Sequence, residues 1–232
     1  RLEDLIFIVT IGVICAMDSE FDLIREALSH GEIQTVGRCE FLSAERAGKR
    51  VVAATCGVGK VNAAVCAQML ISRFGADYVI NSGVAGALSD RLRILDLVAA
   101  RTVFYHDLEE RLLQKYFPHC SRFPADERLA SLVEELAAGQ GVRCVRGEIV
   151  SGEQFVTDSA VKERIARETR ADAIEMEGAA VGHACYLSGV PFAVVRCISD
   201  GADDSGGMDY DTFVEHAARR CAKITLGLID RI

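Results

Sequence analysis

Residues 173–200, AIEMEGAAVGHACYLSGVPFAVVRCISD, hold the pattern that decides the fold of this chain. Small and apolar residues over 176–188 predict a helix, and the apolar run 191–198 predicts a buried strand directly after it. A helix that leads into an apolar strand is the repeating unit of a parallel sheet covered by helices. The pattern therefore predicts an α/β protein.

Acidic side chains flank this unit. Glu175 and Glu177 lie at the start of the helix, and Asp200 ends the strand. Ligands bind α/β sheets at the carboxyl ends of their strands, so three acids at one crevice favour proton chemistry or the binding of hydroxyl groups. With Glu20 near the N-terminus they suggest a hydrolase. Capping of helix amides explains acids in a first turn equally well, so that alternative stays open for Glu20, Glu175 and Glu177.

The rest of the chain repeats the alternation of apolar runs and helical patterns. The expected strands are 5–15, 38–45, 50–56, 77–81, 96–103, 144–150 and 191–198. The expected helices are 18–29, 60–74, 126–139, 159–169, 176–188 and 210–230. Strands 38–45 and 50–56 are separated by a short turn, which predicts an antiparallel hairpin. Residues 106–125 lack periodicity and are expected to form a mobile loop.

Length and composition favour one domain over residues 1–232, with residues 1–10 as an N-terminal extension of the first strand. The apolar run 5–16 is too short to span a bilayer and follows acids rather than basic residues, so we expect a buried strand and no membrane anchor. The net charge of -8 makes nucleic acid a poor partner. The nine cysteines form no CxxC pair, which favours free thiols in the cytoplasm over disulfides or a metal site.

Two glycine-containing segments could bind a ligand through their backbone amides, and each also has a simpler explanation. Residues 56–60, CGVGK, fail as a phosphate-binding loop because Ala54 and Val61 stand where that motif needs Gly and Ser or Thr. Residues 81–87, NSGVAGA, follow an expected strand, and their small side chains would let backbone amides approach a ligand. A plain turn is the alternative for this second segment.

Six motifs, in order along the chain, resemble those of the 5′-methylthioadenosine/S-adenosylhomocysteine nucleosidases of the purine nucleoside phosphorylase superfamily. They are Ala16-Met17-x-x-Glu20, residues 57–64 (GVGKVNAA), 81–86 (NSGVAG), 151–155 (SGEQF), 175–177 (EME) and 196–200 (RCISD). The resemblance runs from about Ile11 to the C-terminus. It implies a three-layer α/β/α sandwich around a mixed, partly closed sheet, a homodimer, and adenine release with water and no cofactor, as in methionine salvage. Phe117 and Pro118 are the candidates for a loop that closes the partner's pocket.

The resemblance also implies roles for individual residues. Glu20 would activate the attacking water, which Arg196 helps to hold, and Asp200 would protonate the purine at N7 with Ser199 orienting it. For the substrate, Glu177 and the backbone of Met176 would bind the ribose hydroxyls, Phe155 would stack on adenine, the backbone of Val156 would read the purine edge, and Tyr210 would lie near the 5′ substituent. Other binding candidates by position are Met17, Val84, Ala85, Gly86, Glu175 and Ala202.

One departure and three alternatives qualify this reading. Many relatives have a hydroxyl residue where this chain has Val84, which leaves Glu20 and Arg196 to position the water. A phosphorylase of the same fold is disfavoured because Glu20 would repel a phosphate beside it. A preference for aminofutalosine is a second hydrolase alternative. A non-catalytic nucleoside sensor would be favoured if Glu20 pointed to solvent.

Overall fold

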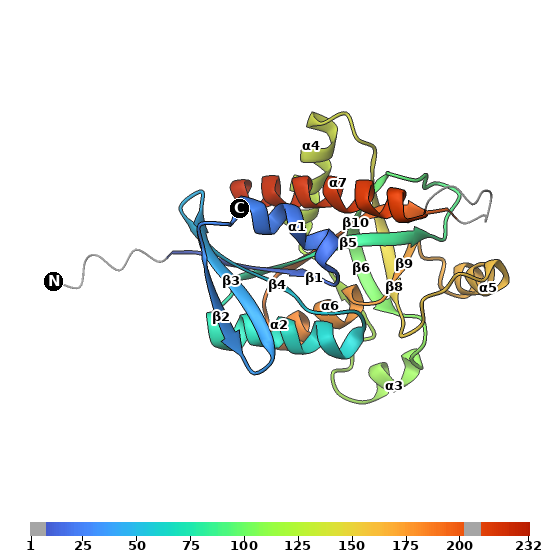
Figure 1. The fold of residues 1–232 in the computed structure, drawn as a ribbon. Helices are drawn as coiled ribbons and strands as arrows, with labels where there is room; N and C mark the ends of the chain where they lie inside the picture. Colours follow the sequence, from blue (N-terminus) through green and yellow to red (C-terminus); the bar gives the residue numbers. More distant parts are fainter. Residues whose placement is uncertain (1–7, 202–209) are drawn as a thin grey trace.

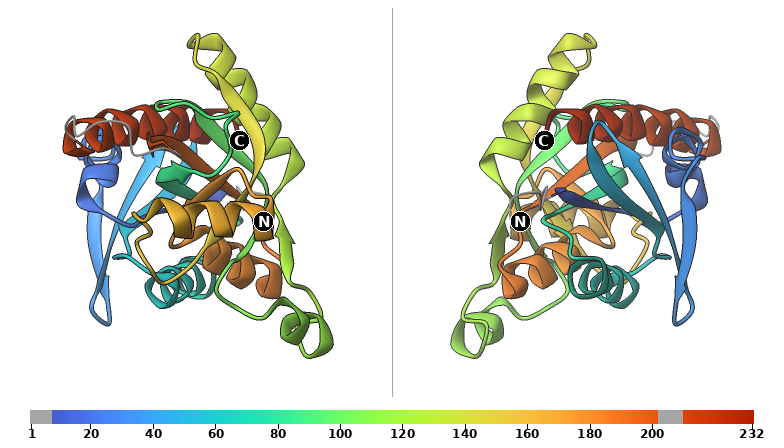
Figure 2. Two further views of the ribbon diagram at one scale, coloured as in Figure 1. Left: turned by 90° about the vertical axis from the view of Figure 1, so that its right-hand side faces the viewer. Right: turned by 90° about the vertical axis from the view of Figure 1, so that its left-hand side faces the viewer.

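A computed structural model describes residues 8–201 and 210–232, and shows a single sheet with helices on both faces (Figures 1 and 2). The strands are β1 (Thr10–Cys15), β2 (Glu32–Val36), β3 (Cys39–Arg46), β4 (Lys49–Thr55), β5 (Tyr78–Ala87), β6 (Leu97–Tyr105), β7 (Arg122–Pro124), β8 (Cys144–Ser151), β9 (Ala173–Glu175) and β10 (Phe192–Asp200). The helices are α1 (Asp18–Ala27), α2 (Lys60–Phe74), α3 (Glu110–Lys115), α4 (Glu127–Gly139), α5 (Ser159–Thr169), α6 (Gly178–Ser188) and α7 (Tyr210–Arg231).

The sheet is mixed and partly closed. Its strand order is β10-β6-β8-β9-β5-β1-β4-β3-β2, and β10 also pairs with β5, which closes the first five strands into a ring. Pairing is parallel between β1 and β4, β1 and β5, β5 and β10, β6 and β8, and β8 and β9, and antiparallel between β10 and β6 and between β5 and β9. This confirms the expected α/β fold with a mixed, partly closed sheet.

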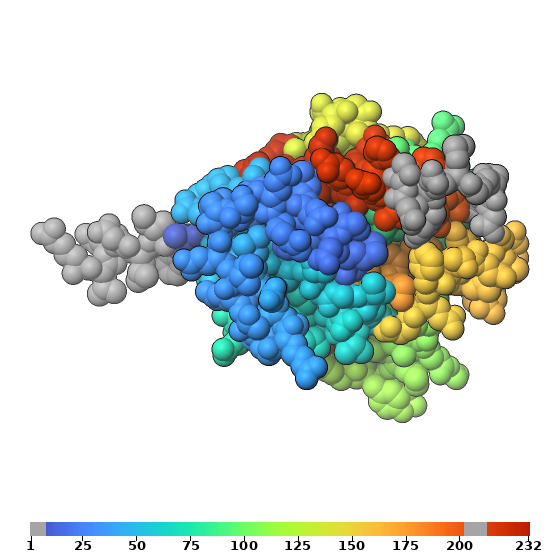
Figure 3. All heavy atoms as spheres, viewed as in Figure 1, coloured from blue at the N-terminus to red at the C-terminus, as the bar shows by residue number. Residues whose placement is uncertain are grey.

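Helices cover the two faces of the sheet with separate apolar cores. Side chains of α1, α4 and α7 pack on one face around Ile24, Val133 and Leu228, while α2 and α6 pack on the other around Leu70 and Val181 (Figure 1). In the space-filling view the blue and cyan N-terminal third covers one end of the molecule and the orange α5 region the other (Figure 3). None of the described helices is long and apolar enough to cross a membrane.

The main differences from the expected elements are short or polar segments. The structure adds β2, β7, β9 and α3, of which α3 and β7 lie inside the expected loop 106–125. The expected hairpin is confirmed as β3 and β4. Residues 81–87 are not a turn, because β5 continues to Ala87 with β10 on one side and β9 on the other. Of the expected strand 5–15, residues 10–15 form β1, and residues 1–7 lie outside the described chain.

Candidate functional site

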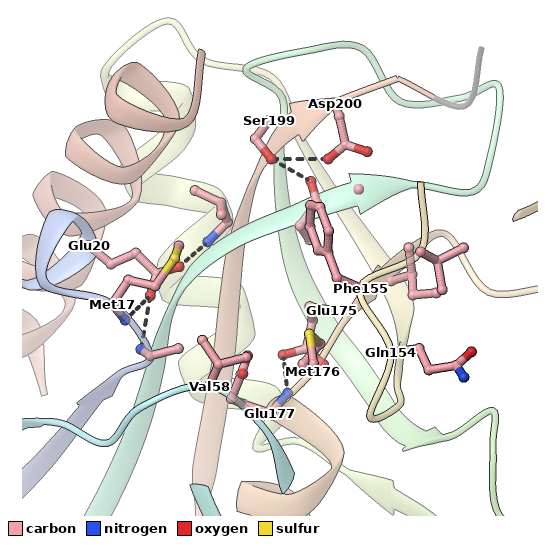
Figure 4. Close-up of a pocket in the computed structure, with 16 residues that line it drawn as sticks. Met17, Glu20, Val58, Gln154, Phe155, Glu175, Met176, Glu177, Ser199 and Asp200 are labelled. Carbon is pink, nitrogen blue, oxygen red and sulfur yellow. Dashed lines mark hydrogen bonds between the residues drawn. The ribbon is translucent and has the colours of Figure 1, made fainter. Parts of the chain in front are cut away.

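A cavity of about 120 Å³ lies where β5, β9 and β10 end and where α1 and α6 begin (Figure 4). Most of the residues predicted for the site meet here, although Met17 and Asp200 are 183 positions apart in the sequence. The cavity is lined by Ala16, Met17, Glu20, Val58, Val84, Ala85, Gly86, Gln154, Phe155, Val156, Ile174, Glu175, Met176, Glu177, Ser199 and Asp200.

Glu20 is held rigidly at the wall of the cavity. It is the third residue of α1 and only 4% exposed. One carboxylate oxygen accepts the N–H groups of Ala16 at 2.9 Å and Met17 at 3.0 Å, and the other accepts the N–H of Val84 at 2.9 Å. Burial raises the pKa of Glu20, against the lowering effects of Arg196 and these three N–H groups. A carboxylate with a raised pKa in a cavity is suited to accept a proton.

The helix-capping reading of Glu20 is therefore also correct, since two of its three bonds satisfy amides before and at the N-terminus of α1. The third bond comes from β5. Gly83 makes that approach feasible, because a Cβ there would overlap the Glu20 carboxylate. The backbone N–H of Val84 thus orients Glu20, whereas the side chain of Val84 offers no hydroxyl to the cavity.

Arg196 lies behind the cavity and does not line it. Its guanidinium, on β10, is 1% exposed, pairs with Glu175, and has Glu177 Oε2 at 3.9 Å. Burial lowers the pKa of Arg196, but Glu175, Glu177 and Glu20 together outweigh this effect, and the guanidinium stays charged. Its Nε is buried without a hydrogen-bond partner among the described residues. Arg196 therefore compensates the charge of the buried acids.

Glu175 and Glu177 have different surroundings. Glu175 accepts the N–H groups of Glu177 at 3.1 Å and Gly178 at 2.7 Å and a hydrogen bond from Ser151, so it caps α6 as well as pairing with Arg196. Glu177 accepts the N–H of Gly59 at 2.8 Å. Burial and the nearby charge of Glu175 raise the pKa of Glu177 to about 7. Glu177 is thus the less satisfied of the two, with an oxygen available to a ligand.

Asp200 approaches the cavity from the end of β10 (Figure 4). Ser199 Oγ donates to its Oδ1 at 3.1 Å, and Lys162 Nζ donates to its Oδ2 at 2.6 Å. Gly86 on β5 faces this carboxylate, since a Cβ there would lie 2.9 Å from Oδ2. The same strand therefore offers a side-chain-free position to each of two acids, Gly83 to Glu20 and Gly86 to Asp200.

A loop between β8 and α5 provides the aromatic side of the cavity. Phe155 is 63% exposed, and the neighbouring Val156 packs against the apolar cluster under α5. The loop is tied down before Phe155, because Glu153 accepts the N–H of Lys60 at 3.1 Å and donates its own N–H to Asp107 at 2.9 Å. An exposed aromatic ring at the mouth of a cavity can stack on a planar ligand.

Five predicted positions are not among the lining residues of the described cavity: Arg196, discussed above, and Ala202, Tyr210, Phe117 and Pro118. Ala202 lies outside the described residues, and of Tyr210 only its place at the start of α7 is described. Phe117 is 77% exposed beyond α3 and is not a lining residue, nor is Pro118.

Several residues at the site were not predicted from the sequence. Val58 and Gln154 line the cavity, Ser151 bonds to Glu175, and Lys162 bonds to Asp200. The sequence does contain a sign of the role of Lys162. It lies three residues before Ile165, so the helical period places both residues on the buried side of α5. A lysine on the inner stripe of a helix indicates a buried partner.

The chain is similar in sequence and in structure to known proteins. Residues 10–230 match the model of the phosphorylase superfamily. The 5′-methylthioadenosine/S-adenosylhomocysteine nucleosidase of Bacillus subtilis is 35% identical over 96% of this chain and 99% of its own. The crystal structure of the Neisseria meningitidis nucleosidase of that name, in complex with methylthio-immucillin-A, superposes with a TM-score of 0.89 at 34% identity and covers 96% of this chain and 99% of that one. The futalosine hydrolase of Helicobacter pylori has a TM-score of 0.89 at 33% identity, over 97% and 99% of the two chains.

Proposed function

Because the chain belongs to the 5′-methylthioadenosine/S-adenosylhomocysteine nucleosidase family of the phosphorylase superfamily, we propose that it hydrolyses the N-glycosidic bond of adenine nucleosides. Its substrates are 5′-methylthioadenosine, S-adenosylhomocysteine or 5′-deoxyadenosine, and adenine is released. One observation carries the proposal: the carboxylates of Glu20, from α1, and Asp200, from β10, line the same cavity. Cleavage with water requires a base at the sugar and an acid at the leaving purine.

The reaction needs these charges because the breaking bond leaves positive charge on the sugar and negative charge on the purine. Glu20 removes a proton from the water that attacks C1′, and a proton delivered through Asp200 neutralises the purine at N7. Glu177 accepts hydrogen bonds from the ribose hydroxyls, and its negative charge stabilises the cationic sugar. Arg196 pairs with Glu175 from behind the cavity and places a positive charge beside the buried acids, and its role in holding the water is proposed from the resemblance alone.

The remaining lining residues determine where the substrate lies. Phe155 stacks on adenine while the backbone of Val156 contacts the purine edge. Met17, Val84, Ala85 and Gly86 form the wall between the two catalytic acids. Ala202 and Tyr210 are proposed for the substrate from the resemblance alone.

Hydrolysis is favoured over phosphorolysis by the charge of the cavity. Its described lining contains four carboxylates, of Glu20, Glu175, Glu177 and Asp200, and no lysine or arginine. A phosphate dianion would be repelled there, whereas a neutral nucleoside and water are not. The burial of Glu20 supports a catalytic site over a sensor that only binds nucleosides.

We also propose a cytoplasmic homodimer. Several exposed apolar side chains belong to α2, α6 and the segment around α3, elements that lie on one side of the sheet (Figure 1), and a contiguous apolar patch is rare on the surface of a monomer. They are Val58, Val61, Val65, Leu108, Leu112, Tyr116, Phe117, Tyr186 and Leu187. Val58 also lines the cavity, so an interface here would reach the site, with Phe117 and Pro118 near the partner's pocket. The free thiols of nine cysteines suit a reducing compartment.

The function is tested by incubating the protein with each nucleoside, and with aminofutalosine, in the presence and absence of phosphate. We expect adenine and the free 5-substituted ribose at the same rate in both conditions. Formation of the sugar 1-phosphate only when phosphate is present would refute hydrolysis. A clear preference for aminofutalosine would keep the reaction type and change the substrate, an alternative favoured by the similarity to the Helicobacter pylori hydrolase.

A further inference from the structure

Lys162 is a buried cation in direct contact with the acid on the purine side. It lies in the first turn of α5, and its side chain is 6% exposed. Its Nζ donates to Asp200 Oδ2 at 2.6 Å and to the carbonyl oxygen of Gly201 at 3.2 Å. Lysine is almost never buried without a partner, and here the partner is the proposed general acid.

This contact raises a difficulty for Asp200 as a simple acid. An ammonium group beside a carboxylate forms an ion pair, in which the shared proton stays on nitrogen. An ionised Asp200 has no proton to give to a purine. Two donors lie one hydrogen bond from its carboxylate, the hydroxyl of Ser199 and the ammonium of Lys162, and an ammonium group is a much stronger acid than an alcohol.

We propose that Lys162 supplies, through Asp200, the proton that the purine accepts when the glycosidic bond breaks. The inference rests on the proposed nucleosidase function and adds a residue to it. Lys162 does not line the cavity, whereas Asp200 does, so its effect passes through Asp200. The inference is based on geometry. Lys162 Nζ donates to Asp200 Oδ2, and Asp200 is the proposed donor to purine N7, so one exchangeable proton lies directly behind the leaving group.

The step balances as follows. The electron pair of the C1′–N9 bond passes into the purine, while one proton moves from Nζ to the Asp200 carboxylate and one from that carboxyl group to N7. Water oxygen bonds to C1′, and its proton goes to Glu20. Lys162 is left as a neutral amine and Glu20 as a carboxylic acid. Exchange with solvent restores both, so the sum is nucleoside and water to adenine and sugar.

Different effects of substitution are expected if the Lys162–Asp200 ion pair is purely structural. Buried ion pairs are often replaced by apolar or other paired residues without loss of stability, because desolvation offsets the attraction. If Lys162 only held Asp200 in place, arginine would hold it as well, since it keeps the charge and the donors. Arginine is not deprotonated in proteins, so it cannot supply the proton.

The test compares Lys162→Met and Lys162→Arg with Arg167→Met, a control that breaks only the exposed pair of Arg167 with Glu163 on the same helix. Two substrates are used: 5′-methylthioadenosine, and p-nitrophenyl 5-methylthioriboside, whose leaving group, p-nitrophenolate, needs no proton. We expect both Lys162 variants to lower kcat for adenine release about 10²-fold with little change in KM. Turnover of the p-nitrophenyl riboside should stay at the wild-type rate, which also shows that the variants are folded.

The pH profile gives a second measurement. In Lys162→Met, Asp200 must take its proton from solvent, so the ratio of variant to wild-type kcat should rise by up to about tenfold for each unit of falling pH. Asp158, at the N-cap of α5, and Glu20, Glu175 and Glu177 of the cavity are the same in both proteins and cancel in this ratio.

Two outcomes would overturn the inference while leaving the nucleosidase function intact. One is full activity of Lys162→Arg on the natural nucleoside. The other is an equal loss on both substrates, which would mean general damage to the site. Absence of adenine release by the wild-type protein would refute the proposed function itself, and this inference with it.

Discussion

At the scale of single residues, Glu20 combines two tasks in one carboxylate. Its bonds to the amides of Ala16 and Met17 fix the start of α1, and its bond to Val84 fixes the same group against β5. Three N–H donors hold the side chain in one rotamer, so little reorganisation is needed when it accepts a proton. Burying this carboxylate costs free energy when it is charged, and the positive charge of the nearby Arg196 reduces that cost.

Glu20→Gln should lower kcat for adenine release by about 10²- to 10⁴-fold, because an amide cannot accept the proton of water. Its single oxygen also cannot satisfy donors on both sides. Asp22→Asn is the matched control, since Asp22 is an exposed residue of the same helix that pairs with Arg25. Initial rates of both variants provide the measurement, and a Glu20→Gln rate near that of the control would remove Glu20 as the base.

The pKa of Glu177 predicts how ligand affinity depends on pH. Ribose hydroxyls donate to the ionised form, and this carboxylate has a pKa of about 7 in the free site. Below pH 7 binding must expel a proton, so affinity for an uncleavable nucleoside analogue should rise as pH increases from 5.5 to about 7 and then level off. Titration calorimetry in buffers of different ionisation enthalpy measures the released proton. The Glu177→Gln variant should show weaker binding with most of this pH dependence removed; an unchanged slope would assign the proton to another group.

The sequence identified most of these residues but could not give their partners. Glu20, Glu175, Glu177 and Asp200 stand at element ends, where periodicity predicts a shared edge of the sheet. The contact of Lys162 with Asp200 joins α5 to β10 across 38 positions, and no local pattern encodes it. The pairing of Arg196 with Glu175 is likewise a property of the packed sheet.

At the scale of elements, β5 is the strand that organises the site. It lies between β1, β9 and β10, and residues 83–86 extend past the carboxyl end of β1 toward the acids. Gly83 and Gly86 leave room on this strand for the carboxylates of Glu20 and Asp200. The absence of side chains at these two positions therefore allows both acids to pack against β5.

Gly83→Ala should therefore impair catalysis while leaving the fold largely intact. The added methyl group overlaps the Glu20 carboxylate and must displace it, and misplacement of a catalytic group by about 1 Å can cost 10²-fold in rate. Gly139→Ala is the control, since a Cβ at this end of α4 meets no atom within 4 Å. Comparing kcat with the midpoint of urea unfolding separates rate from stability. Wild-type kcat in Gly83→Ala would show that Glu20 need not lie where the structure has it.

Long, periodic elements were predictable and short ones were not. The limits of α2 and α5 agree with the expected helices, because Gly59 and Gly75 flank α2 and Asp158 caps the N-terminus of α5. The strand β9 has three residues, too few for any period, and it forms only because β5 and β8 pair with it on either side. The extension of β5 over residues 81–87 was missed because its glycines and small residues are typical of turns.

At the scale of the whole molecule, the exposed apolar residues on the side of α2 and α6 are the basis of the proposed homodimer. Val61 and Val65 are one helical turn apart on α2, and Tyr186 and Leu187 end the neighbouring α6. A surface of this kind in water favours association with a second copy. The sequence alone could not reveal it, because exposure is defined only after packing.

Val61→Glu should shift the protein from dimer to monomer, since it places a charge on this surface in both subunits. Val61 is 73% exposed, so the substitution should not disturb the core. Ile33→Glu is the matched control, because Ile33 is 66% exposed on the edge strand β2 and pairs with Leu42, which packs on the face of α1 and α7 and not on that of α2. Light scattering after size-exclusion chromatography gives the mass of each. A monomeric wild-type protein, or a Val61→Glu dimer as stable as the control, would contradict the proposed interface.

The decisive measurement for the whole account is a crystal structure with a carbon-linked adenine nucleoside analogue, in which the glycosidic bond cannot break. The account predicts one ligand spanning the cavity, with purine N7 about 3 Å from an Asp200 oxygen, the ribose hydroxyls on Glu177, and a water between Glu20 and C1′ on the opposite face of the sugar. A ligand bound with its purine away from Asp200, or with Glu20 out of reach of any water near C1′, would contradict it.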